Sequence, residues 1–150
     1  MMSETVTIRL LGPTDASVLD CVAAGVFDHA IDPRWTAEFL ADARHHMVVA
    51  LLRGQVLGMA SAVHYVHPDK PPELWVNEVG VAASHQGQGI GKQLLDALFA
   101  HGRELGCSEA WLGTEEGNAA ARALYGAVGG HEERMVYVTF ALTANGATPS

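Results

Sequence analysis

A glycine-rich turn between a strand and a long amphipathic helix is the feature that most constrains how this chain folds. Residues Glu73–Ala82 read as a strand, and Gly87–Leu105 carries apolar residues at helical spacing. Between them lies the run Gln86-Gly87-Gln88-Gly89-Ile90-Gly91-Lys92. Glycines let the backbone approach an anion closely, and the first N–H groups of a helix have no partner within it. The segment therefore predicts a site for phosphate groups at a helix N-terminus.

Two common phosphate-binding loops do not fit this spacing. The loop of the P-loop NTPases requires a glycine at position 86 and Ser or Thr at position 93, where this chain has Gln86 and Gln93. The dinucleotide fingerprint requires a third glycine at position 92, which is Lys92. That fingerprint also belongs in the first βαβ unit of a parallel sheet, whereas here several strands come before it. A plain nucleotide-binding protein is therefore disfavoured.

Alternation and helical periodicity predict the remaining elements. Strands are expected at Thr5–Leu11, Met47–Leu52, Val56–Val66, Glu73–Ala82, Ala110–Gly113 and Met135–Leu142. Helices are expected from Thr14 or Asp15 through Val26, from Pro33 to Arg44, and over Gly87–Leu105 and Asn118–Val128. This order predicts an α/β protein in which helices cover both faces of a mixed sheet.

The length and composition indicate one globular domain spanning residues 1–150. Hydrophobic residues make up 49% and charged residues 17% of the chain, and only residues 143–150 have the composition of a frayed tail. There is no apolar run long enough to cross a membrane, and the first residues do not resemble a secretory signal. We therefore expect a cytoplasmic protein without a membrane partner.

The charge balance limits the possible partners. With 17 acidic against 9 basic side chains, the net charge is −8, which argues against nucleic acid. It suits a cationic substrate drawn to an acidic cleft, and it is equally explained by solubility alone. The two cysteines, Cys21 and Cys107, have no metal-ligand spacing and are predicted to be buried free thiols. The histidines are scattered, and no metal site is predicted.

Two ordered motifs resemble those of the GNAT superfamily of N-acetyltransferases. The first is Gln86-Gly-Gln-Gly-Ile-Gly91, which matches the Gln/Arg-x-x-Gly-x-Gly signature for acetyl-CoA. The second is Asn118-Ala-Ala-Ala-Arg-Ala-Leu-Tyr125-Gly-Ala-Val-Gly129, although Gly130 replaces the usual aromatic residue. The resemblance covers nearly the whole chain. It implies a mixed, mostly antiparallel sheet of six to seven strands with about four helices, and acetyl-CoA as the acetyl donor with no metal.

The resemblance also implies which residues hold the cofactor. Backbone groups at the end of the strand would pair with the pantetheine arm, and the glycine-rich loop would hold the pyrophosphate. Asn118 would contact the pantetheine or simply cap its helix. The full set is Val79, Gly80, Val81, Gln86, Gly87, Gln88, Gly89, Ile90, Gly91, Lys92, Asn118 and Tyr125.

Two residues are candidates for proton transfer. Tyr125 matches the tyrosine that lies beside the acetyl sulfur in many members, where a phenol can protonate the departing thiolate. Its structural alternative is a core aromatic. Glu78 is a carboxylate within an otherwise apolar strand, which favours a general base for the amine. Its structural alternative is a hydrogen bond to a neighbouring strand.

The acceptor is predicted from a narrower resemblance, to the aminoglycoside 3-N-acetyltransferases. It rests on the segments Phe27–His29, Tyr65–Val81 and Gly113–Asn118. Aminoglycosides are polycations, so carboxylates gathered at one opening of the sheet would attract them. The implied acceptor-site residues are Asp28, His29, Glu73, Glu78, Glu115 and Glu116. Attack would be direct, within a ternary complex.

Other functions remain open at this point. Polyamines, small metabolites or protein amines are alternative acceptors, since motifs for the cofactor do not define the acceptor. A non-catalytic acyl-CoA sensor is an alternative of another class. The apolar segment Val136–Leu142 either pairs with a second copy across a two-fold axis, giving a homodimer, or completes the sheet of its own chain.

Overall fold

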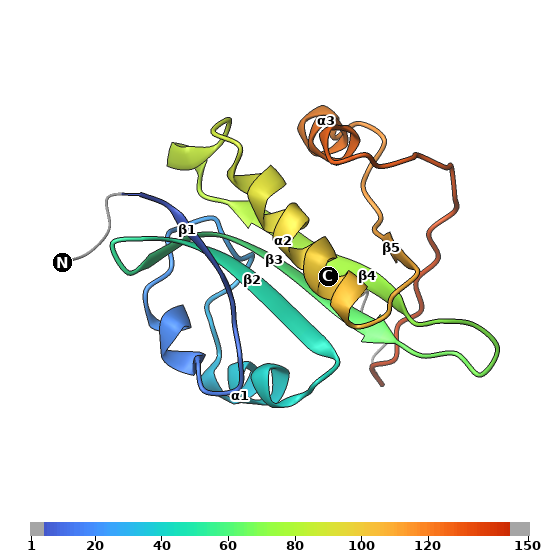
Figure 1. The fold of residues 1–150 in the computed structure, drawn as a ribbon, viewed down its shortest axis with the longest axis horizontal. Coiled ribbons are helices and arrows are strands. Elements are labelled where there is room, and N and C mark those ends of the chain that lie inside the picture. The colour runs from blue at the N-terminus through green and yellow to red at the C-terminus, as the bar shows by residue number, and fades with distance from the viewer. Residues whose placement is uncertain (1–4, 145–150) are drawn as a thin grey trace.

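The protein folds around one five-stranded sheet in a computed structural model that describes residues 5–144 (Figure 1). The strands lie in chain order and are antiparallel, except that the last two run parallel. They are β1 (Thr7–Leu10), β2 (His45–Leu52), β3 (Gln55–Tyr65), β4 (Glu73–Val81) and β5 (Glu109–Trp111). The predicted mixed, mostly antiparallel α/β fold is confirmed.

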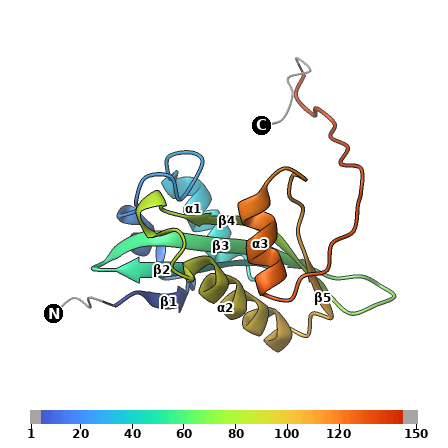
Figure 2. The same cartoon turned by 90° about the horizontal axis from the view of Figure 1, so that it is seen from above.

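Helices cover both faces of this sheet (Figure 2). The α-helices are α1 (Pro33–Ala41), α2 (Ile90–Glu104) and α3 (Ala119–Ala127), and the short 3-10 helices are η1 (Ala16–Asp20) and η2 (Ala83–His85). α2 lies along one face, and α1 and η1 lie on the other. None of the helices within residues 5–144 is long and apolar enough to cross a membrane.

The sheet has a separate apolar core on each face. Because side chains alternate along a strand, Val48 and Ala50 of β2 pack toward α2, whereas Met47 and Val49 pack toward α1 and η1. The core on the α2 side is completed by the buried helix residues Ile90, Leu94, Leu95 and Leu98. Double-sided burial explains why β2 is almost continuously apolar in sequence.

Local sequence signals define the ends of the helices. Asp32 caps α1 by accepting a hydrogen bond from the N–H of Arg34 at 2.8 Å, and Pro33 occupies the first turn. Asn118 caps α3 by accepting from the N–H of Ala121 at 3.1 Å. α3 ends in a Schellman motif in which the N–H of Gly130 donates to the carbonyl of Tyr125 at 2.9 Å.

The count of elements was overestimated from the sequence. The expected helix reaching Val26 is reduced to η1, after which the chain forms an irregular loop across the sheet. The expected strand Met135–Leu142 does not form, and this segment runs unpaired and exposed. Its residues have high β propensity, but propensity alone does not make a strand, and within residues 5–144 this segment pairs with no other strand. The described residues therefore form five strands and three α-helices, where six to seven strands and about four helices were expected.

The cysteine prediction was also partly wrong. Both thiols are free, but Cys21 is exposed because η1 ends before it, and Cys107 is half-buried. Burial raises the pKa of the Cys107 thiol. Of the predicted frayed tail, residues 145–150 lie outside the described residues.

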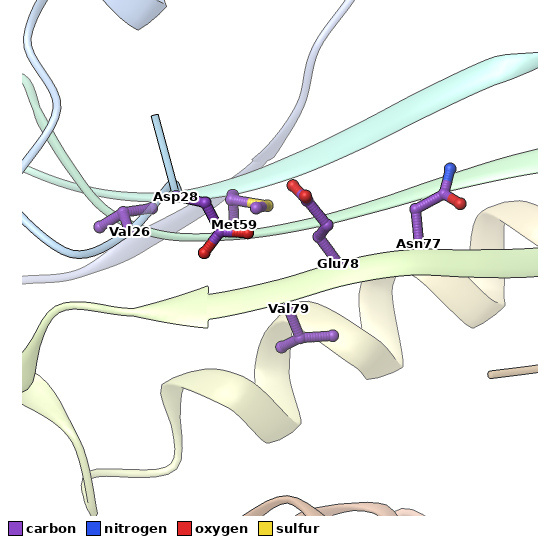
Figure 3. Close-up of a pocket in the computed structure, with 6 residues that line it drawn as sticks. All are labelled: Val26, Asp28, Met59, Asn77, Glu78 and Val79. Carbon is purple, nitrogen blue, oxygen red and sulfur yellow. The ribbon is translucent and has the colours of Figure 1, made fainter. Parts of the chain in front are cut away.

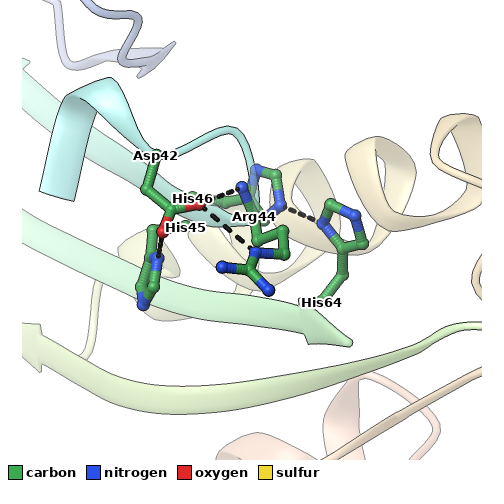
Figure 4. Close-up of polar contacts among 5 residues, drawn as sticks. All are labelled: Asp42, Arg44, His45, His46 and His64. Carbon is green, nitrogen blue, oxygen red and sulfur yellow. Dashed lines mark hydrogen bonds and ion pairs between the residues drawn. The ribbon is translucent and has the colours of Figure 1, made fainter. Parts of the chain in front are cut away.

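Three histidines from distant parts of the chain form a hydrogen-bonded row on the α2 face. His46 of β2 lies between His64 of β3 and His101 of α2 (Figure 4 shows His46 and His64). The Nε2 of His46 is 2.7 Å from the Nδ1 of His64, and the Nδ1 of His46 is 3.0 Å from the Nε2 of His101. Burial, with repulsion from the neighbouring imidazoles, lowers the pKa of His46 to about 4. Among residues 5–144 no group of side chains is arranged to hold a metal ion.

This row makes stability depend on pH. The unfolded chain protonates His46 near pH 6.5, whereas the folded protein does so only near pH 4. The stabilisation is therefore complete above pH 6.5 and falls as the pH drops toward 4, by on the order of 2–3 kcal/mol. We expect His46→Gln, which keeps a donor and an acceptor, to flatten this dependence in urea unfolding at pH 7 and pH 5. The control is His131→Gln, at an exposed histidine. If His46→Gln loses as much unfolding free energy between pH 7 and pH 5 as the parent protein does, His46 is not the source of the pH dependence.

Candidate active site

A β-bulge in β4 determines which way the candidate base points. Ser61 of β3 pairs with Glu78, but the next residue, Ala62, pairs with Val76, so Asn77 is the extra residue. Before the bulge, Leu74 and Val76 face α2. After the bulge, Val79 and Val81 face α2 instead, so Glu78 lies on the opposite face of the sheet.

Glu78 lines a pocket on the sheet face opposite α2 (Figure 3). In this view Glu78 and Val79 leave β4 on opposite sides, and Asp28 comes from the loop that crosses the sheet. The pocket has a volume of about 200 Å³. It is lined by Val26, Asp28, Met59, Asn77, Glu78 and Val79.

The pocket changes the acidity of Glu78. Partial burial raises the pKa of this carboxyl, the negative charge of Asp28 raises it further, and His29 opposes them. A carboxylate with a raised pKa is a better proton acceptor than an ordinary surface glutamate. Glu78 and Asp28 together also give the pocket the negative charge that a cationic amine would require.

The loop bearing Asp28 is held close to β4 by a glycine. A side-chain Cβ at Gly80 would lie 2.2 Å from the backbone oxygen of Val26, so only glycine allows this approach. Val26 itself is buried in the core beneath the loop. The glycine therefore determines the wall of the pocket opposite Glu78.

β4 also has a free edge where the cofactor is expected. Its parallel pairing with β5 covers only Glu73–Trp75, so within the described residues the strand has no ladder partner on that side from Val76 onward. On its other side, Val79, Gly80 and Val81 pair with β3. Extended backbone with an open edge can add an amide-containing ligand as a further strand, as predicted for pantetheine.

The glycine-rich loop has the geometry of an anion site. Gly87 and Gly89 have φ of +77° and +81°, and there is open space where their side chains would be. Gly89 is the N-cap of α2, so the unpaired N–H groups of the first turn open onto the loop. The amide of Gln86 donates to the carbonyl of Val81 at 3.0 Å and braces the loop against β4.

The other predicted cofactor residues have structural roles that are visible here. A Cβ on Gly91 would lie 3.0 Å from Leu124, so this glycine allows α2 and α3 to pack together. Asn118 caps α3, and Lys92 pairs with Asp96 at 3.2 Å. Tyr125 is half-buried on α3 beside the α2 core, and burial raises the pKa of its hydroxyl, which keeps it protonated.

The predicted acidic cluster does not assemble as a whole. Only Asp28 and Glu78 line the pocket, while His29 lines a neighbouring hollow. Glu73 lies at the start of β4, roughly 16 Å along the strand from Glu78, where it accepts a hydrogen bond from Tyr65. Glu115 and Glu116 are exposed in the loop before α3, where Glu116 pairs with Arg134. How far apart these residues lie in the sequence does not reveal how far apart they lie in the folded protein.

Sequence reasoning missed three of the six residues that line the pocket. They are Asn77, Val26 and Met59. Asn77 alone had a usable signal, as an exposed polar residue next to Glu78 in an apolar strand. Val26 and Met59 look like ordinary core residues, and only the path of the loop brings them to the pocket.

Comparison with known proteins agrees with this geometry. Residues 18–129 match the acetyltransferase (GNAT) family. An aminoglycoside N(6′)-acetyltransferase type 1 of Stenotrophomonas maltophilia is 31% identical over 91% of this chain and 94% of its own length. The N-alpha-acetyltransferase RimI of Mycobacterium tuberculosis is 34% identical over 85% of this chain and 79% of its own length.

A solved structure shares the fold. It is an aminoglycoside acetyltransferase from an uncultured soil metagenomic sample, in complex with sisomicin. It superposes with a TM-score of 0.79 at 20% identity, over 92% of this chain and 97% of its own. The expected family resemblance is therefore confirmed, although the curated aminoglycoside relative is of the 6′ type rather than the 3-N type.

The loop geometry leads to a testable difference between two glycines. Gly89 and Gly54, in the turn between β2 and β3, both have positive φ and open space around them. Alanine at either should destabilise the fold similarly, by about 1–2 kcal/mol. Only Gly89→Ala should also weaken acetyl-CoA binding, by roughly tenfold or about 1.4 kcal/mol in calorimetry. Equal affinities in the two variants would show that the loop does not hold the cofactor.

Proposed function

This chain belongs to the GNAT family and is an acetyl-CoA-dependent N-acetyltransferase, and we propose that its acceptor is an amine of an aminoglycoside. The observation that carries the proposal is the single pocket that Asp28 and Glu78 both line, next to a strand, β4, whose edge is free from Val76 onward within the described residues. Two carboxylates in one pocket suit a substrate with several ammonium groups. The S. maltophilia relative, named for this activity, supports the choice. The proposal includes a cytoplasmic location and a homodimeric state.

The pocket and loop fit acetyl-CoA through backbone groups. Gly87 and Gly89 provide an open turn before α2, and the N–H groups there would hold the pyrophosphate. Val79–Val81 would align the pantetheine arm along β4, and the thioester would then lie toward Glu78. When bound, acetyl-CoA supplies an acyl carbon activated by its thiolate leaving group.

Glu78 would act as the general base. An amine must lose a proton before its nitrogen can attack, and the raised pKa of Glu78 suits the carboxylate to accept that proton, directly or through water. The C–N bond forms as the C–S bond breaks, within a ternary complex. Tyr125, kept protonated by burial, would give its hydroxyl proton to the departing sulfur.

The relatives bear on which amine is acetylated. The narrower resemblance in the sequence implied the 3-amino group, whereas the curated aminoglycoside relative is named for the 6′ position. We therefore favour the 6′-amine over the 3-amine. A pocket of about 200 Å³ accepts one amino group and part of a sugar ring, so the position depends on how the rest of the molecule lies across the sheet.

A second acceptor class is supported by the other relative. The N-alpha-acetyltransferase RimI is 34% identical to this chain, which is slightly higher than the aminoglycoside relative. A peptide α-amine also needs a base and a negative pocket, so the site geometry is compatible with both acceptors. The two acceptors differ in charge, since an aminoglycoside carries several ammonium groups.

A matched pair of aminoglycosides tests the acceptor and the position together. One compound carries an amine at C6′ and the other carries a hydroxyl there, and both keep the 3-amine. With acetyl-CoA, we expect thiol release and N-acetylation only for the compound with the 6′-amine. Equal acetylation of both would exclude the 6′-amine as the acceptor and leave the amines that the two compounds share, the 3-amine among them. Turnover on peptides with a free α-amine and none on either compound would contradict the aminoglycoside proposal while leaving the enzyme class intact.

The role of Glu78 is tested by an isosteric change. Glu78→Gln should lower kcat at least about tenfold and leave acetyl-CoA affinity unchanged, because the amide fills the same space without accepting the proton. In the parent enzyme kcat/KM should fall as the pH drops through the raised pKa of Glu78, and this acid limb should be absent in Glu78→Gln. The exposed Glu104→Gln on α2 is the matched control. An acid limb that persists in Glu78→Gln would exclude this residue as the base.

A further inference from the structure

Two tryptophans stack on the sheet face that carries Glu78. Trp75 of β4 and Trp111 of β5 are direct partners where the two strands lie side by side (Figure 1). Their ring centroids are 5.4 Å apart, with 10° between the ring planes. Leu74 and Val76, the neighbours of Trp75 along β4, pack toward α2, so Trp75 lies on the opposite face. Trp75 is 39% exposed, and a large aromatic side chain left uncovered near a candidate active site is a candidate contact for a ligand.

A chain of hydrogen bonds through three strands holds the stack in place. The indole N–H of Trp111 donates to the hydroxyl of Tyr65 on β3, and that hydroxyl donates to a carboxylate oxygen of Glu73 on β4 at 2.8 Å. The bond from Tyr65 is the main cause that lowers the pKa of Glu73, which therefore stays ionised at neutral pH. The stack is thus fixed before any ligand binds, and a ligand is spared the entropy cost of ordering these side chains.

The surface of β4 between the stack and the pocket is open to a ligand. The helices on this face, α1 and η1, pack against β2 and β3. Asn77, which lies between Trp75 and Glu78, is exposed and lines the pocket. Three residues of strand separate Trp75 from Glu78, a distance of roughly 10 Å. A molecule of three sugar rings can therefore place an amine at Glu78 and a further ring against the tryptophans.

Negative charge lies next to the stack. Glu109 is the partner of Glu73 in the pairing of β4 with β5, two residues before the tryptophans, so two carboxylates lie side by side. Glu73 has Lys70 and His67 each at 3.8 Å, whereas the exposed Glu109 makes no ion pair within residues 5–144. Like charges directly opposite each other destabilise a sheet, and a bound ammonium group would relieve this repulsion. The indole face also attracts cations, more strongly than the other aromatic side chains do.

We propose that Trp75 and Trp111 form a second acceptor subsite, which binds an aminated sugar ring of the same molecule whose reacting amine lies beside Glu78. The C–H groups of the ring pack on the indoles, and its ammonium group lies near the indole faces and Glu109. The inference rests on the proposed aminoglycoside acceptor, and adds to it a preference for acceptors with a charged distal ring. The pocket of about 200 Å³ holds one amine and part of a ring, so the remaining rings must be bound by the surface outside it.

Kinetics with two acceptors test the subsite. Neamine has two rings, and kanamycin B has the same two rings with a third, aminated sugar. With saturating acetyl-CoA, the parent enzyme should have the lower KM for kanamycin B. Trp75→Leu should raise this KM about tenfold with little effect on kcat, and Trp75→Phe should restore most of the affinity because it keeps an aromatic face. The matched control is Trp35→Leu, at a tryptophan of α1 that is 70% exposed.

The outcomes separate the subsite from the acceptor itself. If both compounds are acetylated and Trp75→Leu leaves the ratio of their KM values unchanged, the tryptophans have only a structural role. The subsite is then wrong, and the aminoglycoside proposal stands. If the parent enzyme releases no thiol with either compound, both proposals fail.

Fluorescence reports on the stack without turnover. The chain has three tryptophans, so Trp35→Phe leaves only Trp75 and Trp111 as emitters. Titration of this variant with kanamycin B, with CoA in place of acetyl-CoA, should change the emission saturably in the concentration range of the KM. Neamine should change it less, because it lacks the third ring. Constant emission at concentrations of kanamycin B that saturate turnover would show that the acceptor does not reach the stack, and would overturn the proposal.

Discussion

The rest of the site depends on the extra residue in β4. Up to Val76 the strand is an ordinary sheet element, paired on both edges at its start and packed against α2. At Asn77 the pairing with β3 shifts by one residue, and every later side chain changes face. Glu78 is thereby taken out of the α2 core, where its charge would be costly, and placed on the opposite face beside Asp28. On its other side the same strand has a free edge from Val76 onward, because its pairing with β5 ends at Trp75.

The protein has a net charge of −8, so its anionic cofactor, acetyl-CoA, and the cationic acceptor of the proposed function must be attracted by different means. At the loop the attraction would come from backbone N–H groups at the start of α2, since the side chain of Lys92 is paired with Asp96. At the pocket it comes from carboxylates. Backbone dipoles act over short range, whereas the negative charge of the whole molecule extends farther and favours a polycation. The acidic composition is therefore compatible with both ligands.

Small residues bring the parts of this site together. Gly80 lets the loop that carries Asp28 cross β4, Gly91 lets α3 approach α2, and Gly58 of β3 lies under Leu94, where a Cβ would come within 3.1 Å. Each lies where two segments would otherwise be held apart by a side chain. Gly130 acts in the same way at the end of α3, where a Cβ would lie 2.8 Å from the carbonyl oxygen of Tyr125.

The sequence by itself determined the parts that depend on neighbouring residues. The glycine-rich turn before α2, Pro33 in the first turn of α1 and the cap at Asn118 were all predictable, because φ preferences and capping hydrogen bonds act over a few residues. The motif order was sufficient for the family. Only the tertiary structure decided that Glu78 faces away from α2 and that Asp28 lines the same pocket while Glu73 does not. It also decided that residues 135–142 pair with no strand within residues 5–144. The register between strands and the meeting of side chains at the pocket depend on segments far apart in the chain. Those contacts exist only once the chain has folded.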